Sequence, residues 1–239
     1  MRFEFLNARL SATIIATLLA LSLPVVAGAT TTTPRPDTNL SYGETAAGES
    51  AISGRFQQIY PGTSFFVNEP IEILEIRFRP HETGSFSASL SDVSISLSTT
   101  ETRPLAISGQ FADNASTTPT EVYSGELELA SRGISGSPSK DFNIAIALQQ
   151  PFLYDPQEGN LLLDWNNRGS VSSSGAAVNF DFIGRRFATA SSLTGDAAWG
   201  ETESGGLATR FSDGVIPEPT GALLFSIAAV MTLAPRKRR

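Results

Sequence analysis

Glu126 and Glu128 are the residues whose type and spacing come nearest to a catalytic pair. Residues two apart on a β-strand point to the same face, which places these carboxylates about 6.5–7 Å apart, near the separation used by glycosidases. Leu127 and Leu129 take the alternate, inward positions, so we expect both Glu side chains on a solvated face. A glycoside hydrolase or lyase therefore ranks last among the functions considered.

Oxygen-bearing side chains gather around a second candidate site, a glycine-containing loop that could bind Ca²⁺. Its members are Asp155, Glu158, Asn160 and Asp164. Calcium prefers oxygen ligands of this kind, but the spacing differs from that of an EF-hand loop. The alternative is a turn in which Asp155 and Asn160 cap backbone groups. We expect no cofactor and no catalytic metal, and keep structural calcium as the alternative.

Nucleophilic catalysis by a Ser–His–Asp triad would have to use His81, the one histidine of the chain. It follows Pro80 and precedes Glu82, which predicts an exposed turn instead. Cysteine is absent, so thiolate nucleophiles and Cys-ligated metals are excluded. No phosphate-binding glycine motif and no nucleophile elbow occurs. We therefore expect a protein that is not an enzyme and has no catalytic residues.

The two tryptophans are candidates for stacking on sugar rings. Trp165 ends the apolar run 161–165, and we expect it in the core. Trp199 lies in 196–201, where a loop would expose its indole. Trp199 is therefore the better candidate for a possible glycan contact, and Trp165 is expected in the core.

Apolar and polar residues alternate from residue 51 onward, which predicts a series of short β-strands. These strands and the loops between them would carry the candidate residues. The expected strands cover 52–59, 71–78, 85–91, 93–98, 122–129, 142–148, 161–165, 178–182, 187–190 and 207–211. About ten short strands without an amphipathic helix predict an all-β fold over 51–214, an antiparallel β-sandwich or jelly roll. Residues 30–50, rich in Thr, Pro, Gly and Ser, are expected to form a flexible linker, with an edge strand at its end as an alternative.

The alternation within these strands predicts which side chains face the core. In 71–78 the apolar face comprises Leu74, Ile76 and Phe78, and the polar face Glu75, Arg77 and Arg79. In 85–98 the alternation changes phase by one residue near Asp92. Such a slip would turn apolar side chains to the wrong face, so we expect a β-bulge or a turn there.

Residues 1–29 have the parts of a secretory signal peptide. Two arginines supply the positive start, and 10–23 is apolar apart from Ser and Thr. Ala27 and Ala29 form an A-x-A cleavage site. Cleavage there would leave Thr30 as the new N-terminus.

The C-terminal segment 215–239 contains a Pro-Glu-Pro-Thr motif, the apolar run 221–234 and a basic terminus, in that order. The motif is Pro217, Glu218, Pro219 and Thr220, and the basic terminus is Arg236, Lys237, Arg238 and Arg239. As a helix the apolar run covers about 21 Å, short of the roughly 30 Å hydrocarbon core, so it spans only with bilayer thinning or help from its flanks. The cations would hold the C-terminus in the cytoplasm. An ordinary tail anchor is the alternative.

This tail, on a chain with a signal peptide, resembles the PEP-CTERM sorting signal. The resemblance implies processing by exosortase, a membrane-embedded transpeptidase-like protease, near 217–220. It also implies an inner-membrane-anchored precursor in a Gram-negative-type bacterium and delivery to the cell surface or the extracellular matrix. Several stretches of 55–211 resemble a β-sandwich ectodomain found ahead of this signal.

The charge of the chain agrees with export. Residues 30–220 hold 11 basic and 23 acidic side chains, a net charge of −12. Such a domain repels nucleic acid and anionic lipid, so neither is expected as a partner. We therefore expect an exported protein with a structural or adhesive role, associated with exopolysaccharide or biofilm. A carbohydrate-binding module of the same fold is the alternative.

Overall fold

Two antiparallel β-sheets make up the protein, which was studied as a computed structural model. The structure describes residues 30–32, 45–48, 52–65, 67–81, 83–134 and 141–214. In chain order the strands are β1 (Thr30–Thr32), β2 (Thr45–Ala47), β3 (Arg55–Tyr60), β4 (Ile71–Phe78), β5 (Phe86–Thr100), β6 (Thr120–Ser131), β7 (Ile144–Tyr154), β8 (Asn160–Asn167), β9 (Val171–Gly175), β10 (Phe180–Ser192), β11 (Glu201–Leu207) and β12 (Thr209–Gly214). The described 3-10 helices are η2 (Gly62–Ser64), η3 (Pro104–Ala106) and η4 (Phe111–Asn114). The prediction of an antiparallel all-β fold is confirmed.

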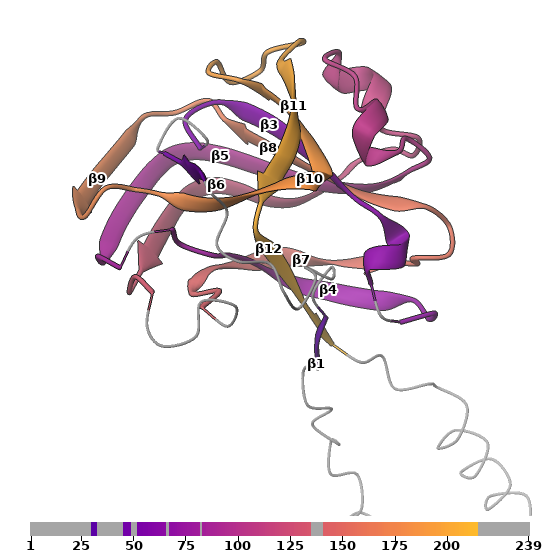
Figure 1. The fold of residues 1–239 in the computed structure, drawn as a ribbon, viewed down its shortest axis with the longest axis horizontal. Coiled ribbons are helices and arrows are strands. Elements are labelled where there is room, and N and C mark those ends of the chain that lie inside the picture. The colour runs from indigo at the N-terminus through magenta and orange to yellow at the C-terminus, as the bar shows by residue number, and fades with distance from the viewer. Residues whose placement is uncertain are drawn as a thin grey trace, which may run out of the picture.

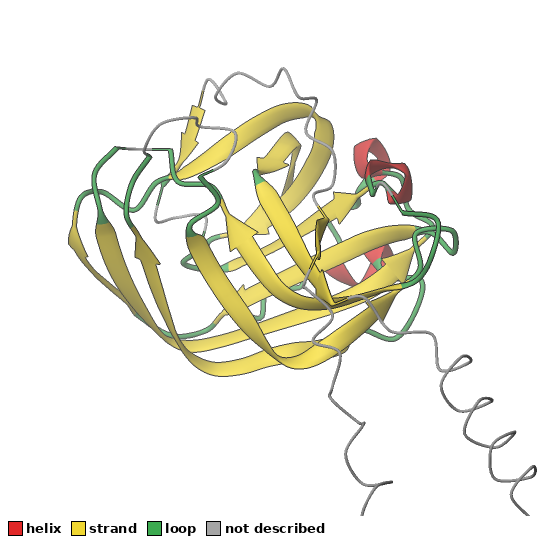
Figure 2. Ribbon diagram, turned by 90° about the horizontal axis from the view of Figure 1, so that it is seen from below, coloured by secondary structure: helices red, strands yellow, loops and turns green. Residues whose placement is uncertain are grey.

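The larger sheet has eight strands and curls into a half-barrel, which Figure 2 shows most clearly. Its strand order is β11-β10-β3-β8-β5-β6, with β2 paired to β10 and β9 paired to β5. The smaller sheet has the order β1-β12-β4-β7. Figure 1 shows β4, β7 and β12 lying below the curled sheet.

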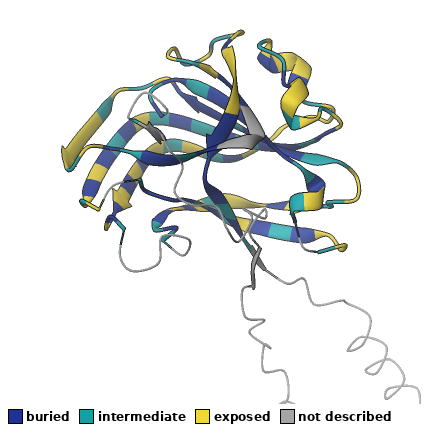
Figure 3. Ribbon diagram, in the orientation of Figure 1, coloured by how far each residue is buried: buried dark blue, intermediate teal, exposed yellow. Residues whose placement is uncertain are grey.

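One hydrophobic core takes side chains from both sheets. Ile76 and Phe211 come from the smaller sheet, and Leu97 and Trp165 from the larger. The Trp165 ring stacks on Phe56 with the ring centroids 5.8 Å apart, and it is fully buried, which confirms its expected place. Along β5 the buried and less buried positions alternate, as the bands of Figure 3 show. This alternation follows from the two-residue period of a strand.

The phase change predicted near Asp92 is a β-bulge within one continuous strand. The register of β5 against β6 shifts between Leu90 and Val93. Both of these residues are fully buried, although they are three positions apart in the chain. The shift therefore turns the apolar side chains that follow Asp92 back toward the core. The prediction is confirmed, and Asp92 is left on the outer side, where its carboxylate accepts hydrogen bonds from Arg168.

Two side chains of the β4 region lie on the side opposite to the one predicted. Leu74 is 37% exposed, whereas Ile73 is fully buried. The cause is a register shift between Ile73 and Glu75 in the pairing with β7, which changes the phase of the alternation. Arg79, expected on the polar face, is almost fully buried because the chain there enters the contact between the sheets.

Several strands differ from those predicted, in their bounds or in not having been predicted at all. The predicted strands 178–182 and 187–190 are one strand, β10, with a register shift between Ile183 and Ala188 in its pairing with β11. Strands β9 and β11 were not predicted, because their Ser, Gly, Thr and Glu residues show no apolar alternation. Within 30–50, the structure describes β1 on β12 and β2 on β10.

The chain passes from the larger to the smaller sheet at Ala208, the single residue between β11 and β12. Around it, three backbone hydrogen bonds form a ring. The amide of Ala208 donates to Asp181 at 2.8 Å, that of Asp181 donates to Arg79 at 2.9 Å, and that of Arg79 donates to Ala208 at 3.1 Å. We call these three residues the sheet junction.

The two predicted processing ends flank this fold. The signal peptide with Ala27 and Ala29, the Pro-Glu-Pro-Thr motif and the basic terminus all lie outside the described residues. Among the residues that are described, no helix is long and apolar enough to cross a membrane.

Candidate functional site

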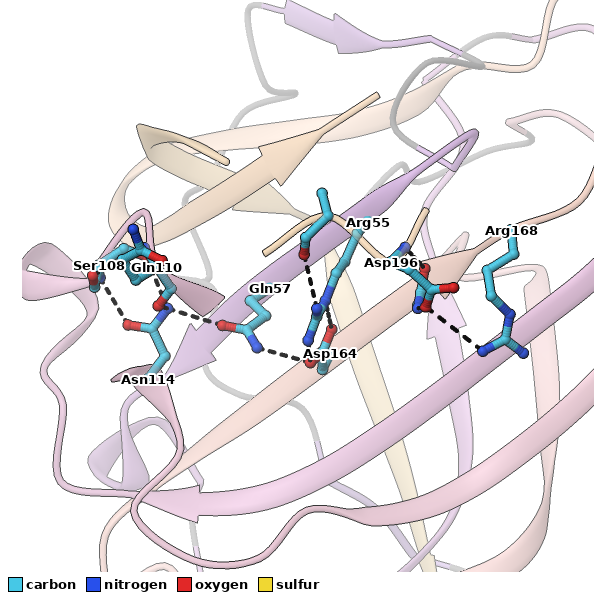
Figure 4. Close-up of polar contacts among 10 residues, drawn as sticks. Arg55, Gln57, Ser108, Gln110, Asn114, Asp164, Arg168 and Asp196 are labelled. Carbon is cyan, nitrogen blue, oxygen red and sulfur yellow. Dashed lines mark hydrogen bonds and ion pairs between the residues drawn. The ribbon is translucent and has the colours of Figure 1, made fainter. Parts of the chain in front are cut away.

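A row of polar side chains crosses the outer face of β3 and β8 (Figure 4). Arg55 and Gln57 in β3 stand directly opposite Asn166 and Asp164 in β8. Side chains alternate along a strand, so these four point away from the core that holds Trp165. The row supplies donors and acceptors to the loops that lie over this face.

Asp164 is the centre of the row. It accepts hydrogen bonds from Arg55 Nε to Oδ1 at 3.0 Å and from Arg55 Nη2 to Oδ2 at 2.7 Å. The side-chain amide of Gln57 donates to the same Oδ2 at 2.8 Å, and Asn114 donates to Gln57 Oε1 at 2.9 Å. A bidentate Arg–carboxylate pair fixes direction as well as distance, so the network is rigid.

The loop segment 193–200 is hydrogen-bonded to this row of polar side chains. Asn166 Nδ2 donates to Asp196 Oδ1 at 2.7 Å, and the Asp196 amide donates back to Asn166 Oδ1 at 2.9 Å. Arg55 Nη1 donates to the Ala197 carbonyl at 2.9 Å. Asp196 has a φ of 55°, in the left-handed region that Asp tolerates better than most residues.

A second loop, 101–119, joins the first through a short antiparallel bridge between Gln110 and Trp199. The Phe111 amide donates to the Ala198 carbonyl at 3.1 Å, and the Gly200 amide donates to the Gly109 carbonyl at 2.9 Å. The backbone on both sides of Trp199 is therefore held in place.

Trp199 is 55% exposed, as its loop position predicted. A Cβ placed on Gly109 would lie 2.5 Å from the indole nitrogen Nε1, so the ring rests directly against the glycine backbone. We call Trp199 and the 109–111 backbone beside it the Trp199 platform. An exposed indole whose loop is fixed offers a flat apolar surface on which the CH face of a sugar can stack.

The structure does not bring the four calcium candidates together. Asp155 Oδ1 accepts the Gln157 amide at 2.9 Å, and Asn160 Oδ1 accepts the Gly62 amide at 3.0 Å, as the capping alternative predicts. Asp164 lies four residues further along β8, about 13 Å from Asn160, and is paired with an arginine. Within the described ranges no group of three or more Asp, Glu or His side chains could hold a metal ion.

Glu126 and Glu128 lie exposed on β6, whereas Leu127 and Leu129 are buried. The solvated position expected for the two carboxylates is therefore confirmed. Glu126 accepts a 3.4 Å hydrogen bond from the Ser89 hydroxyl, also on the exposed face.

His81 differs from the expected exposed turn residue, because it is half-buried beside the sheet junction. Its Nδ1 lies 3.3 Å from Oδ1 of Asp181, whose side chain is fully buried. Asp181 also forms an ion pair with Arg79, whose Nε donates to Oδ2 at 2.6 Å. The carboxylate therefore neutralises a buried guanidinium besides contacting the imidazole.

This Arg79–Asp181–His81 cluster was missed by reasoning from the sequence. Asp181 follows an apolar residue in a predicted strand, and nothing near it in the chain indicates a buried charge. Only the meeting of β4 and β10 at the sheet junction brings the partners together.

A scan against models of known protein families gives no match, and neither does a search of curated proteins.

Proposed function

We propose that this chain is an exported protein of the cell envelope or extracellular matrix, with a structural or adhesive role rather than a catalytic one. Its sorting would depend on the PEP-CTERM-like segment 215–239 and on exosortase as the processing partner. The observation that carries the proposal is the three-part order of this tail, which follows directly on β12. The predicted mature N-terminus, Thr30, is likewise the first residue of β1.

The intact mass of the native protein, recovered separately from membranes and matrix, tests the sorting. We expect a matrix form that begins at Thr30 and ends within 217–220. A variant with Pro217→Ala and Pro219→Ala should accumulate uncut in the membrane fraction. A wild-type mass that retains 236–239, found only in membranes, would instead establish an ordinary tail anchor and refute the proposed processing.

We further propose that the two sheets form a β-sandwich, in which the smaller sheet closes the open side of the curled one. The shared hydrophobic core supports this arrangement, because a single cluster takes buried residues from both sheets. A jelly roll is one form of such a sandwich.

A second candidate function is carbohydrate binding at the Trp199 platform. The specific observation in its favour is an indole that is 55% exposed although the backbone around it is hydrogen-bonded on both sides. Leu105 and Leu193, 73% and 74% exposed, lie on the same two loops and would enlarge the apolar contact area. Exopolysaccharide is the ligand class that agrees with the proposed location.

Co-sedimentation of the full chain with exopolysaccharide from the producing cells tests this function. We expect Trp199→Ala to weaken binding by about tenfold, the equivalent of about 1.4 kcal/mol. The matched control is Leu153→Ala, which removes an exposed apolar side chain from the other sheet and should bind normally. Equal binding by the Trp199→Ala variant would exclude the platform as the site.

A further inference from the structure

Two arginines lie directly opposite each other in the β4–β12 ladder. Arg77 is the register partner of Arg210. Their neighbours Ile76 and Phe211 point into the core, so both arginine side chains leave the smaller sheet on its outer face. Like charges in directly opposed positions destabilise an antiparallel pair, so a negative charge beside them would stabilise this arrangement.

Only one of the two arginines has a carboxylate. Glu75 Oε2 lies 2.7 Å from Arg77 Nε and also accepts the Ser212 hydroxyl at 3.1 Å. The Arg210 side chain, by contrast, makes no hydrogen bond or ion pair with any residue that the structure describes. Its Nε is buried without a partner, and its guanidinium lies over the Phe142 ring at 4.4 Å from the centroid.

The surroundings of Arg210 are cationic. Burial first, and then the charges of Arg77 and Arg79, lower the pKa of Arg210. Asp181 is the one fully buried carboxylate among the described residues, and it is already paired with Arg79. Among the side chains that the structure describes, none is shown to supply a compensating charge to Arg210.

The outer face beside the two arginines is lined by small side chains. Ala145 stands opposite Arg77 in β7, and Ala147 stands opposite Glu75. Both alanines are exposed. A ligand group can therefore approach the guanidinium groups along this face without displacing a large side chain.

We propose that Arg77 and Arg210 bind a carboxylate group of an acidic ligand on the outer face of the smaller sheet. The planar guanidinium fork matches a carboxylate bidentately, and the contact with the Phe142 ring restricts the Arg210 side chain. The net charge of −12 on residues 30–220 repels anions at long range, so binding in the millimolar range and strong salt dependence are expected. The proposal depends neither on the sorting signal nor on the Trp199 platform.

Thermal unfolding of the purified full chain in sodium glucuronate tests the proposal, with sodium chloride holding the ionic strength constant. A ligand that binds only the native state raises the melting temperature, by about 3 °C near saturation. Sodium acetate should act similarly at higher concentration if the carboxylate alone is recognised.

Three variants separate a binding site from a structural cluster. Arg210→Met keeps the contact with Phe142 but removes the charge, and should abolish the rise. Glu75→Gln removes the competing carboxylate, and should give the same rise at a several-fold lower glucuronate concentration. The control Arg168→Met removes an arginine that is paired with Asp92 on the larger sheet, and should leave the rise unchanged.

An equal rise in Arg210→Met, or no difference between glucuronate and chloride, would overturn the proposal. If Arg210→Met fails to fold, the wild-type protein decides the question through methyl NMR signals. Glucuronate should shift the Ala145 and Ala147 methyl resonances saturably. Unshifted signals at these two alanines would exclude the site.

Discussion

Asn166, on the outer face of the larger sheet, exchanges two hydrogen bonds with Asp196 of the loop above it, at 2.7 and 2.9 Å. The amide side chain acts here like a segment of backbone, because it donates to a side-chain oxygen and accepts from a main-chain amide. Asp196 is three residues before Trp199 in the chain. Its two bonds to Asn166 therefore hold the loop in place just before the Trp199 platform.

We expect Asn166→Ala to cost about 1–2 kcal/mol of stability, because both bonds to Asp196 are lost. It should also loosen the platform, so that the Trp199 resonance of fluorotryptophan-labelled protein shifts while that of Trp165 stays. Asn143→Ala is the matched control, since Asn143 ties Gly133 at 2.7 Å in another loop. A Trp199 signal that moves equally in both variants would contradict the assignment of Asn166 as its anchor.

Asp181→Asn should be among the most destabilising changes of a single side chain. It leaves the buried guanidinium of Arg79 without its counter-charge, a loss of about 3–5 kcal/mol. Urea unfolding of the variant measures this cost. Asp92→Asn breaks an exposed pair with Arg168 and should leave the midpoint almost unchanged, because solvent screens that pair. Equal losses in the two variants would show that burial does not decide the strength of these pairs.

Two glutamines each form hydrogen bonds with both backbone groups of one residue, one glutamine in a buried position and the other in an exposed one. Gln58 is fully buried and bonds both the amide and the carbonyl of Leu207, at 2.8 and 3.0 Å. Gln149 bonds both backbone groups of Ser124 at 3.1 and 2.9 Å, but in an exposed position.

Gln58→Ala should cost about 3 kcal/mol, because two buried backbone groups lose their partners. Gln149→Ala should cost less than about 1 kcal/mol, since water replaces the lost bonds. Denaturant midpoints measured in the same buffer compare the two directly. A larger loss for Gln149→Ala would be incompatible with this account.

Alkaline pH should unfold the protein through its buried tyrosines. Burial raises the pKa of Tyr60 far above the ordinary 10.0, and the pKa of Tyr154 is raised by burial and by Asp155. The unfolded chain loses these protons near pH 10 while the folded chain keeps them. The stability they contribute is complete below pH 10 and falls as the pH rises above it, by about 1.4 kcal/mol per pH unit for each group.

The Tyr60→Phe variant tests this pH dependence. It loses the 2.8 Å hydrogen bond to Thr209, so it should be about 1 kcal/mol less stable near neutrality. Its denaturation midpoint should then decline less steeply than that of the wild type between about pH 10 and pH 11.5. Parallel declines would mean that Tyr60 is not the titrating group.

Local alternation in the sequence was enough to predict β4 and the bulge at Asp92, because the period of a strand is visible in neighbouring residues. It was not enough for β9, whose serines are placed by pairing with β5. Nor did it predict that Leu74 faces outward, since that depends on a register shift against β7. Strand edges and registers belong to pairings between distant segments, which the pattern of one strand does not contain.

The same distinction applies to the candidate sites. The exposure of Trp199 was predictable from the polar loop around it, and the burial of Trp165 from the apolar run before it. The pairing of Arg79 with Asp181, and the opposition of Arg77 to Arg210, arise only when β4 meets β10 and β12. Side-chain chemistry in a sheet is set by which strands become neighbours.

The register of Thr30 with Asp213 has a mechanical consequence. Figure 1 shows β1 beside β12, so the chain enters and leaves the domain at the same end of one ladder. A tensile force applied to both ends would open this ladder like a zipper, one pair after another, without shearing the core. A force applied from the C-terminal end against a ligand would instead load β12 against β4. The domain would then resist tension applied through its C-terminal end, whereas tension between its two ends would peel β1 from β12.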